Sequence, residues 1–339
     1  MKKSILSTAL LACSLFANAQ LYIYKNGELR YSMDETPDSI VFHAPAVNEG
    51  QGSIDPPVEE KIPYNYNANL QYHAAPNNYL NNCQQAGKVT TEYYNGIRGN
   101  KTLKVYTPYG YDENKKYNIL YLMHGGGENE NTIFGSDVML QNILDHMIMN
   151  GELEPMIVVT PTFNGTGSEA QNFWEELRKS VIPFVEGKYS TYAESTSDAD
   201  IKASRRHRAY GGFSMGCVST WNVFLYCLDY VAYFMPLSGD LWCNGCNSGQ
   251  DKARNVDAAI AQSGLTQRDY FIFAATGSDD IAYPNENPQI EAMKNSSNFV
   301  YTSDFSKGNL YFMVAPGLTH WWGYVRHYVY DGLPYFFHE

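Results

Sequence analysis

The segment Gly212-Phe213-Ser214-Met215-Gly216 constrains the fold of this chain more than any other. Residues 208–211 before it have the composition of a short buried strand, and residues 217–230 after it are apolar enough for a buried helix. A Gly-x-Ser-x-Gly segment between a strand and a helix lets the chain turn sharply, because the glycines leave space around the serine. The serine hydroxyl then faces a cleft, as a nucleophile requires. The alternative is an ordinary Gly-rich turn with an incidental serine.

Strand-like and helix-like segments alternate along residues 74–339. We expect strands at residues 88–94, 101–107, 117–123, 156–160, 208–213, 230–236, 270–275 and 310–315. We expect helices at residues 136–150, 172–189, 217–228, 256–263, 288–295 and 322–337. Two early strands with an antiparallel look, followed by β–α alternation, predict an α/β three-layer sandwich with a mostly parallel central sheet.

The first residues have the pattern of an export signal. Lys2 and Lys3 precede an apolar run at residues 5–16, and Ala17-Asn18-Ala19 has the small residues of a cleavage site. The run is too short for a stable membrane span. We therefore predict a signal peptide at residues 1–19 and a periplasmic or secreted protein. A lipoprotein anchored through Cys13 is the alternative.

Two further segments precede the main pattern. Residues 20–45 predict a small β-rich element, with strands at 21–24 and 39–42 and a turn at Lys25-Asn26-Gly27. Residues 46–73 are rich in Pro, Gly, Asn and Glu over most of their length, which predicts a linker. The main domain is then expected at residues 74–339.

The charge and composition narrow the classes of partner. The formal net charge of −12 argues against nucleic acid and anionic membranes. No segment after the signal peptide is long and apolar enough to cross a bilayer. Only 18% of the residues are charged while 28 are tyrosine, so the polar surface is rich in hydroxyl and amide groups. Such a surface suits ligands with hydroxyl groups and rings.

The cysteines give no indication of a metal or a cofactor. Five remain after removal of the signal peptide, an odd number for an exported protein, so at least one thiol is free or bonded to another chain. Cys243 and Cys246 have the spacing of a redox pair or half a zinc site, but no second pair completes such a site. A small loop disulfide or two free thiols is expected there.

A serine nucleophile needs a base within hydrogen-bonding distance. His320 is the best candidate, because Pro316 and Gly317 form a turn that places it in a loop after the last predicted strand. Five other histidines lie in the N-terminal segments, before the nucleophile strand, or on and beyond the last helix: His43, His73, His207, His327 and His338.

The base in turn needs an acid to orient it. The loop after the strand at residues 270–275 offers Asp280 first and Asp279 second, and Asp240 after the preceding strand is a third candidate. Loop aspartates often cap helices or form turns, so at least one of the adjacent pair is structural. Serine, acid and histidine in this chain order are typical of α/β-hydrolases.

Backbone N–H groups must also stabilise the oxyanion that forms during acyl transfer. Met215 supplies one at the start of the helix after the nucleophile, where the helix dipole favours negative charge. Gly125 and Gly126 offer the other, in the segment His124-Gly125-Gly126-Gly127 directly after an apolar strand. A phosphate-binding loop is the alternative, but no Lys-Ser/Thr follows and Glu128 would repel phosphate.

With these motifs, residues 74–339 resemble the feruloyl and acetyl-xylan esterases of carbohydrate esterase family one, in the esterase D-like branch of the α/β-hydrolases. The resemblance is carried by residues 105–111 and 116–125, by the helix around residues 176–186, and by the segment 212–216 with methionine after the serine. Cys217 departs from the pattern, since the family generally has a glycine there. The N-terminal element lies outside the resemblance.

The resemblance implies Ser214 as the nucleophile, His320 as the base and Asp280, rather than Asp279, as the acid. It implies a secreted serine esterase that releases hydroxycinnamates such as ferulate from xylan or xylo-oligosaccharides. The substrate-binding residues expected near the base and in the loop after residues 156–160 are Trp321, Trp322, Phe163 and Asn164. Either tryptophan could instead pack in the core.

Three other functions remain open from the sequence. An acetyl-xylan esterase would use the same catalytic residues with a smaller acyl pocket. A serine peptidase shares the fold and chain order, although no propeller or lid domain is evident. A carbohydrate-binding protein without activity is the third, and the complete set of Ser214, Asp280 and His320 argues against it. The oligomeric state is not indicated.

Overall fold

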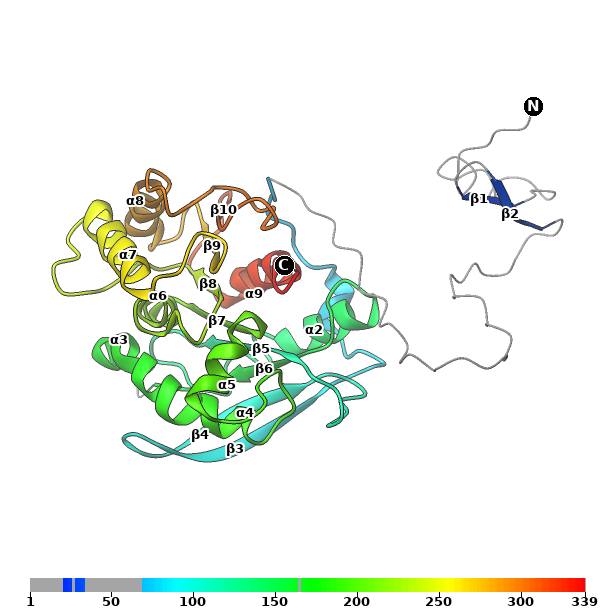
Figure 1. Ribbon diagram of the computed structural model, residues 1–339, viewed down its shortest axis with the longest axis horizontal. Helices are drawn as coiled ribbons and strands as arrows, with labels where there is room; N and C mark the ends of the chain where they lie inside the picture. The colour runs from blue at the N-terminus through cyan, green and yellow to red at the C-terminus, as the bar shows by residue number, and fades with distance from the viewer. Residues whose placement is uncertain (1–20, 26–27, 34–68, 164–165, 339) are drawn as a thin grey trace. The chain divides into compact units, whose positions relative to one another are not determined.

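The computed structural model describes residues 21–25, 28–33, 69–163 and 166–338 (Figure 1). The chain divides into two compact units, residues 1–59 and 60–339. In the first unit, β1 (Leu21–Lys25) pairs antiparallel with β2 (Glu28–Met33), with an irregularity in register between Ile23 and Tyr24. A small β-rich element was predicted here with its second strand at residues 39–42, whereas the strand that pairs with β1 is β2. The predicted strand at 39–42, the signal peptide and Cys13 lie outside the described residues.

The second unit is built on a sheet of eight strands in the order β10-β9-β8-β7-β5-β6-β4-β3. Its antiparallel pairs are β3 with β4 and β4 with β6, whereas the remaining pairs are parallel. The strands are β3 (Lys88–Gly96), β4 (Gly99–Thr107), β5 (Asn118–Met123), β6 (Met156–Thr160), β7 (Arg208–Phe213), β8 (Tyr233–Leu237), β9 (Phe271–Gly277) and β10 (Leu310–Ala315). The prediction of a mostly parallel α/β sheet is confirmed.

The burial of the strands follows from their place in the sheet. Every residue of β5, β6 and β7 is buried, since helices cover both faces of the central parallel strands. The edge strand β3 is much more exposed, with buried residues only at Glu92 and Tyr94. Continuous apolar runs therefore mark the centre of the sheet, next to the nucleophile.

Helices form a layer on each face of the sheet (Figure 1). A buried core that includes Trp221 and Phe224 lies between the sheet and a first layer of helices. A second core, which includes Tyr328, lies between the other face of the sheet and the helices α2 and α9. The first layer contains α3 (Gly167–Glu176), the π-helical turn η2 (Leu177–Val181), α4 (Ile182–Glu186), α6 (Met215–Cys227), α7 (Gly249–Ser263) and α8 (Tyr283–Met293). The opposite layer contains α2 (Leu140–Met149) and α9 (Trp322–Gly332).

Several helices begin at residues other than those predicted. α7 starts seven residues earlier than expected because the Ser248 side chain caps it by accepting from the N–H of Asp251. α2 starts later, since Met139 has the left-handed φ of 54° and residues 136–139 form a turn. One short helix was not predicted, α5 (Asp198–Ala203), which is capped by Ser197.

Residues 69–73, placed in the linker by the prediction, contact the domain. The N–H of Leu70 donates to Ser303 at 3.0 Å, and that of His73 donates to Asp331 at 2.8 Å. The ring of Tyr72 packs edge-on against Tyr328 with centroids 5.8 Å apart. The folded domain thus includes residues 69–73 in addition to the predicted residues 74–339.

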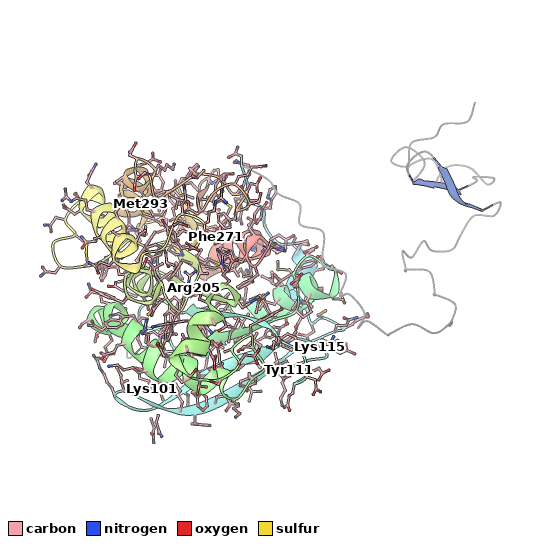
Figure 2. The ribbon with its side chains drawn as sticks, in the orientation of Figure 1. Lys101, Tyr111, Lys115, Arg205, Phe271 and Met293 are labelled. Atoms are coloured by element: carbon pink, nitrogen blue, oxygen red, sulfur yellow. A yellow bond between two sulfur atoms is a disulfide. The ribbon has the colours of Figure 1, made fainter. Side chains whose placement is uncertain are left out.

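Two arginines, one half-buried and one buried, bind to the amino edge of the sheet. The Arg205 guanidinium donates to the carbonyl oxygens of Leu228, Val231 and Asp269, beside the start of β9 at Phe271 (Figure 2). Arg208 at the start of β7 forms a fully buried ion pair with Glu186. Among the described helices, none is long and apolar enough to span a membrane.

Candidate active site

Ser214 lies on a sharp turn between β7 and α6. Its backbone has φ 58° and ψ −115°, a left-handed φ that a serine rarely adopts, and its N–H donates to Leu237 at 3.0 Å. A Cβ on Gly212 would lie 2.5 Å from the carbonyl oxygen of Gly216, and one on Gly216 would lie 2.4 Å from that of Met123. Only glycine fits these two positions, so the strand–turn–helix prediction is confirmed.

Three side chains from separate loops meet at this turn. His320, in the loop after β10, has its Nε2 at 2.9 Å from Ser214 Oγ. Its Nδ1 lies 2.7 Å from Asp280 Oδ1, which comes from the loop after β9. The parallel order β10-β9-β8-β7 places all three loops at the carboxyl edge of the sheet. Residues 106 positions apart in the sequence are thereby brought into hydrogen-bonding contact.

Asp280 is the carboxylate that orients His320. Burial alone would raise the pKa of Asp280, but hydrogen bonds from His320 and from the backbone N–H of Ala282 outweigh it and lower the pKa. Asp279 is exposed and accepts from the Ser278 hydroxyl instead, while Asp240 forms a buried ion pair with Lys252. The order of the three predicted acids therefore agrees with the geometry.

The remaining described histidines have other partners. His327 accepts from the N–H of Ala75 at 3.0 Å, and burial lowers its pKa to about 4. His207 contacts Asn118 at 2.8 Å on the opposite edge of the sheet. Neither reaches Ser214.

The glycine segment after β5 lies beside the nucleophile. The N–H of Gly125 donates to Glu128 Oε2 at 2.7 Å, so this glycine does not offer a free donor. The N–H of Gly126 has no acceptor among the described residues. A Cβ on Gly126 would lie 2.6 Å from Met215 Sδ, which shows how closely this segment approaches the start of α6. The two predicted glycines are thus not equivalent.

A cleft of about 320 Å³ opens above Ser214 and His320. One wall is the glycine segment with Glu128, and another is formed by Trp321 and Trp322. The Trp321 ring is 54% exposed and packs edge-on against Tyr324, whereas Trp322 is buried and its Nε1 donates to Glu128 at 2.8 Å. The cleft can hold an acyl group against the nucleophile.

The family model described as "Putative esterase" matches residues 95–327. The chain belongs to this esterase family. The match includes Ser214, Asp280 and His320 together with the glycine segment, and it agrees with the resemblance found in the motifs.

Two relatives are similar to different shares of the chain. The chain is 69% identical to endo-1,4-beta-xylanase Y of Acetivibrio thermocellus over 276 residues. These residues make up 81% of this chain. The match spans 25% of that relative, so the chain corresponds to about a quarter of xylanase Y. A second relative, the endo-1,4-beta-xylanase/feruloyl esterase of Xylanibacter ruminicola, is 32% identical over 152 residues, 41% of this chain and 19% of that protein.

Solved structures share the fold. A serine-to-alanine mutant of the feruloyl esterase module from Clostridium thermocellum, complexed with sinapinate, has a TM-score of 0.80 and 68% identity over 82% of this chain and 97% of that one. The CE1 ferulic acid esterase of Anaeromyces mucronatus has a TM-score of 0.56 at 19% identity, over 79% and 98% of the two chains. The second likeness is one of fold alone. The esterase therefore has the predicted α/β-hydrolase fold.

The structure separates the residues predicted to bind substrate. Trp321 and Trp322 line the cleft, but Phe163 does not. Phe163 is buried against His124 with ring centroids 4.6 Å apart, because His124 Nε2 bonds to the neighbouring Thr162 and holds the loop after β6 down. The expectation for Phe163 was wrong. Asn164 lies outside the described residues.

Three further residues line the cleft and were not predicted from the sequence. Thr132, Asp137 and Val138 come from the segment between β5 and α2, whose turn at residues 136–139 was predicted to be helical. Glu128 was noticed only as a group that repels phosphate. The left-handed Met139 ends the turn and has no signal in the sequence.

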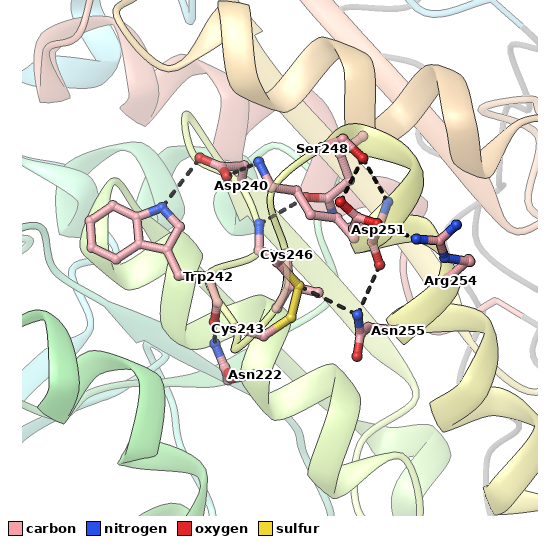
Figure 3. The surroundings of a disulfide bond; sticks show 12 residues. Asn222, Asp240, Trp242, Cys243, Cys246, Ser248, Asp251, Arg254 and Asn255 are labelled. Atoms are coloured by element: carbon pink, nitrogen blue, oxygen red, sulfur yellow. Dashed lines mark hydrogen bonds and ion pairs between the residues drawn. A yellow bond between two sulfur atoms is a disulfide. The ribbon is translucent and has the colours of Figure 1, made fainter.

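The loop after β8 holds a disulfide (Figure 3), and it begins beside the nucleophile, since a Cβ on Gly239 would lie 2.9 Å from the Ser214 carbonyl oxygen. Cys243 and Cys246 form the small loop disulfide that was one of the two predicted states. The Trp242 indole N–H donates to Asp240 at 3.4 Å, and the Trp242 carbonyl oxygen accepts from Asn222 at 3.2 Å. Cys217 is fully buried next to this loop, and burial raises the pKa of its thiol, so it stays protonated.

Within the described part of the chain, no three His, Cys, Asp or Glu side chains gather as metal ligands would. The side chains around Ser214 are arranged instead for proton transfer and for nucleophilic attack.

Proposed function

We propose that the esterase hydrolyses hydroxycinnamoyl esters, such as ferulate esters on the arabinose side chains of xylan, through a covalent acyl-enzyme. The observation that supports this most is the pair of contacts that joins Ser214 to His320 and His320 to Asp280. The relationship to a feruloyl esterase module solved with sinapinate supports the acyl group.

In the first step, His320 Nε2 takes the proton of Ser214 as Oγ attacks the ester carbonyl carbon. The N–H groups of Met215 and Gly126 stabilise the resulting oxyanion, and the Gly125 N–H is not used for this. Asp280 holds the imidazole in the tautomer whose Nε2 accepts the proton, and its carboxylate stabilises the imidazolium. His320 then gives the proton to the departing sugar oxygen, which leaves as an alcohol.

In the second step, water attacks the acyl-enzyme. His320 removes a proton from the water, a second tetrahedral intermediate forms in the same oxyanion hole, and Ser214 leaves with the proton returned from His320. The products are the hydroxycinnamic acid and the free enzyme. No cofactor or metal takes part in this scheme.

The cleft suits an aromatic acyl group attached to a sugar. The exposed ring of Trp321 borders the cleft, where it can stack on the phenolic ring or on a sugar ring. The Trp322 ring is buried, and we assign it to the support of the cleft rather than to direct contact. The N-terminal signal pattern supports export, so that the enzyme meets plant polysaccharide outside the cytoplasm.

The substitution Ser214→Ala tests this function. We expect kcat on methyl ferulate to fall by a factor on the order of 10⁵–10⁶, with an unchanged circular dichroism spectrum. Ser195→Ala, in an exposed loop whose serine does not contact Ser214, His320 or Asp280, serves as the matched control and should retain the parent rate. Parent-like hydrolysis by Ser214→Ala would refute the catalytic mechanism. Faster release of acetate from acetylated xylan than of ferulate would refute the hydroxycinnamate preference.

A further inference from the structure

We propose that Glu128 is a positioning residue, whose carboxylate fastens the oxyanion segment, residues 124–127, to the start of α9 and so aims the Gly126 N–H at the reacting carbonyl. This inference rests on the proposed esterase mechanism and adds to it a residue that the sequence motifs did not assign.

One oxygen atom of Glu128 joins two elements of the site. Its Oε2 accepts from the backbone N–H of Gly125 at 2.7 Å and from the indole N–H of Trp322 at 2.8 Å. Gly125 directly precedes the proposed oxyanion donor, and Trp322 follows the base His320 by two residues. Hydrogen bonds to an ionised acceptor are the stronger kind, so this bridge can fix the distance between the two loops.

Aromatic packing links the same bridge to the nucleophile. Phe213, the residue before Ser214, lies with its ring centroid 4.5 Å from that of His320 and 5.0 Å from that of Trp322. A Cβ on Gly125 would lie 3.3 Å from Phe213 Cδ1 and 3.2 Å from Glu128 Oε2. Glu128, Trp322 and Phe213 thus form a continuous contact from the oxyanion segment to the nucleophile and the base.

The glycine segment needs such a support because its backbone is intrinsically free. Three consecutive glycines lose more conformational entropy on ordering than other residues would, and Gly127 adopts a φ of 75°. The bond to Glu128 fixes the peptide plane that ends at the Gly125 nitrogen. The next peptide plane carries the Gly126 N–H, so its direction depends on that bond.

The contacts of Glu128 distinguish this role from direct acid–base catalysis. The Ser214 hydroxyl is bonded to His320, and Glu128 Oε2 already accepts two hydrogen bonds. A carboxylate pointed at the oxyanion would oppose the negative charge that develops there. Glu128 therefore acts through Gly125 and Gly126 rather than on the substrate.

The test uses Glu128→Ala, Glu128→Gln and Trp322→Phe in the full chain, with 4-nitrophenyl acetate as the substrate. For Glu128→Ala we expect kcat to fall about 10- to 100-fold with little change in KM, since a displaced donor acts mainly on the transition state. Glu128→Gln keeps an acceptor oxygen and should recover most of the rate. Trp322→Phe keeps a smaller aromatic ring but loses the indole N–H and therefore its bond to Glu128, and should lower kcat about threefold to tenfold.

The second readout is inhibition by phenylboronic acid, which bonds to the serine and places an oxygen where the oxyanion forms. In Glu128→Ala its inhibition constant should rise by about the same factor by which kcat falls, while the affinity for sinapinate stays near that of the parent. Glu130→Ala is the matched control, because this neighbouring carboxylate accepts from the Thr102 hydroxyl and should leave kcat unchanged.

Three outcomes would overturn the inference. They are an unchanged kcat in Glu128→Ala, an equal loss of affinity for boronate and sinapinate, or a rate in Glu128→Gln as low as in Glu128→Ala. If Glu128→Ala does not fold, an unchanged kcat in Trp322→Phe would overturn it instead. Because neither 4-nitrophenyl acetate nor phenylboronic acid carries a hydroxycinnamate, an error in the proposed acyl preference would not affect the kcat values or the boronate inhibition constants. Loss of all activity in Ser214→Ala remains the separate test of the mechanism.

Discussion

Each end of helix α9 has a buried aspartate carboxyl group nearby, and the two carboxyl groups have different hydrogen-bond donors around them. At the start of α9, Asp280 receives hydrogen bonds from His320 and from the N–H of Ala282, and its pKa is lowered despite burial. At the other end, the Asp331 carboxyl group accepts a hydrogen bond from the N–H of His73 at 2.8 Å. The imidazole of His73 lies 3.7 Å away and is largely exposed. Burial raises the pKa of Asp331 to about 8.

The difference shows that donors, and not depth, decide the charge of a buried carboxyl group. Asp280 has a strong donor in the imidazole and stays ionised, so it can support an imidazolium during catalysis. Asp331 lies at the carboxyl end of a helix, where the dipole also disfavours negative charge, and it holds its proton at neutral pH. Asp280 at the start of α9 thus serves catalysis. Asp331 at the end of α9 instead lowers the stability of the fold as the pH rises above the acidic range.

The largest expected effect is on kcat, through the ionised Asp280 at the start of α9. Asp280→Asn should lower kcat by a factor on the order of 10⁴, because the amide favours the wrong imidazole tautomer and gives no charge to the imidazolium. The measurement is steady-state hydrolysis of methyl ferulate. Asp279→Asn is the matched control, since this exposed neighbour does not contact His320. Equal losses in the two variants would remove the distinction between them.

The next effect is on stability at the other end. The folded state holds a proton on Asp331 up to about pH 8, while the unfolded chain releases it near pH 4, so this group makes the protein less stable as pH rises between those values. Asp331→Asn should remove that dependence. The variant should match the parent near pH 4 and exceed it at pH 8 by on the order of 1–3 kcal/mol.

Thermal unfolding at several pH values measures this, with kcat as the internal control because Asp331 is remote from Ser214. A variant whose melting temperature runs parallel to that of the parent at every pH would show that Asp331 is ionised in the folded protein.

The smallest expected effect concerns Trp321, the exposed tryptophan at the start of α9. Trp321→Ala removes an exposed ring that borders the cleft, and should raise KM for methyl ferulate about 2- to 10-fold with kcat nearly unchanged. Tyr109→Ala removes another exposed ring and serves as the control. A fall in kcat rather than a rise in KM would mean that Trp321 supports the loop of His320 instead of the substrate.

The sequence was sufficient for the sheet and for the three residues that meet at its carboxyl edge. Apolar strands and Gly-rich turns are local signals, and parallel strands bring the loops that follow them to one edge. This is why Ser214, Asp280 and His320 could be placed together from their positions after predicted strands.

Contacts between distant side chains could not be predicted in the same way. The bond from Trp322 to Glu128 joins residues 194 positions apart, and neither residue has a local pattern that indicates it. Phe163 was expected in the cleft from its loop position, but packing against His124 turns it into the core. The proton on Asp331 depends on which donors surround it, and composition gives no information on that.

The most direct test of the account is to trap the acyl-enzyme. The parent enzyme is mixed with 4-nitrophenyl ferulate, quenched in acid within milliseconds, digested and analysed by mass spectrometry. The account predicts a burst of 4-nitrophenol and a feruloyl group on the peptide that contains Ser214, both absent in Ser214→Ala. A feruloyl group on another residue, or an equal burst in the variant, would contradict it.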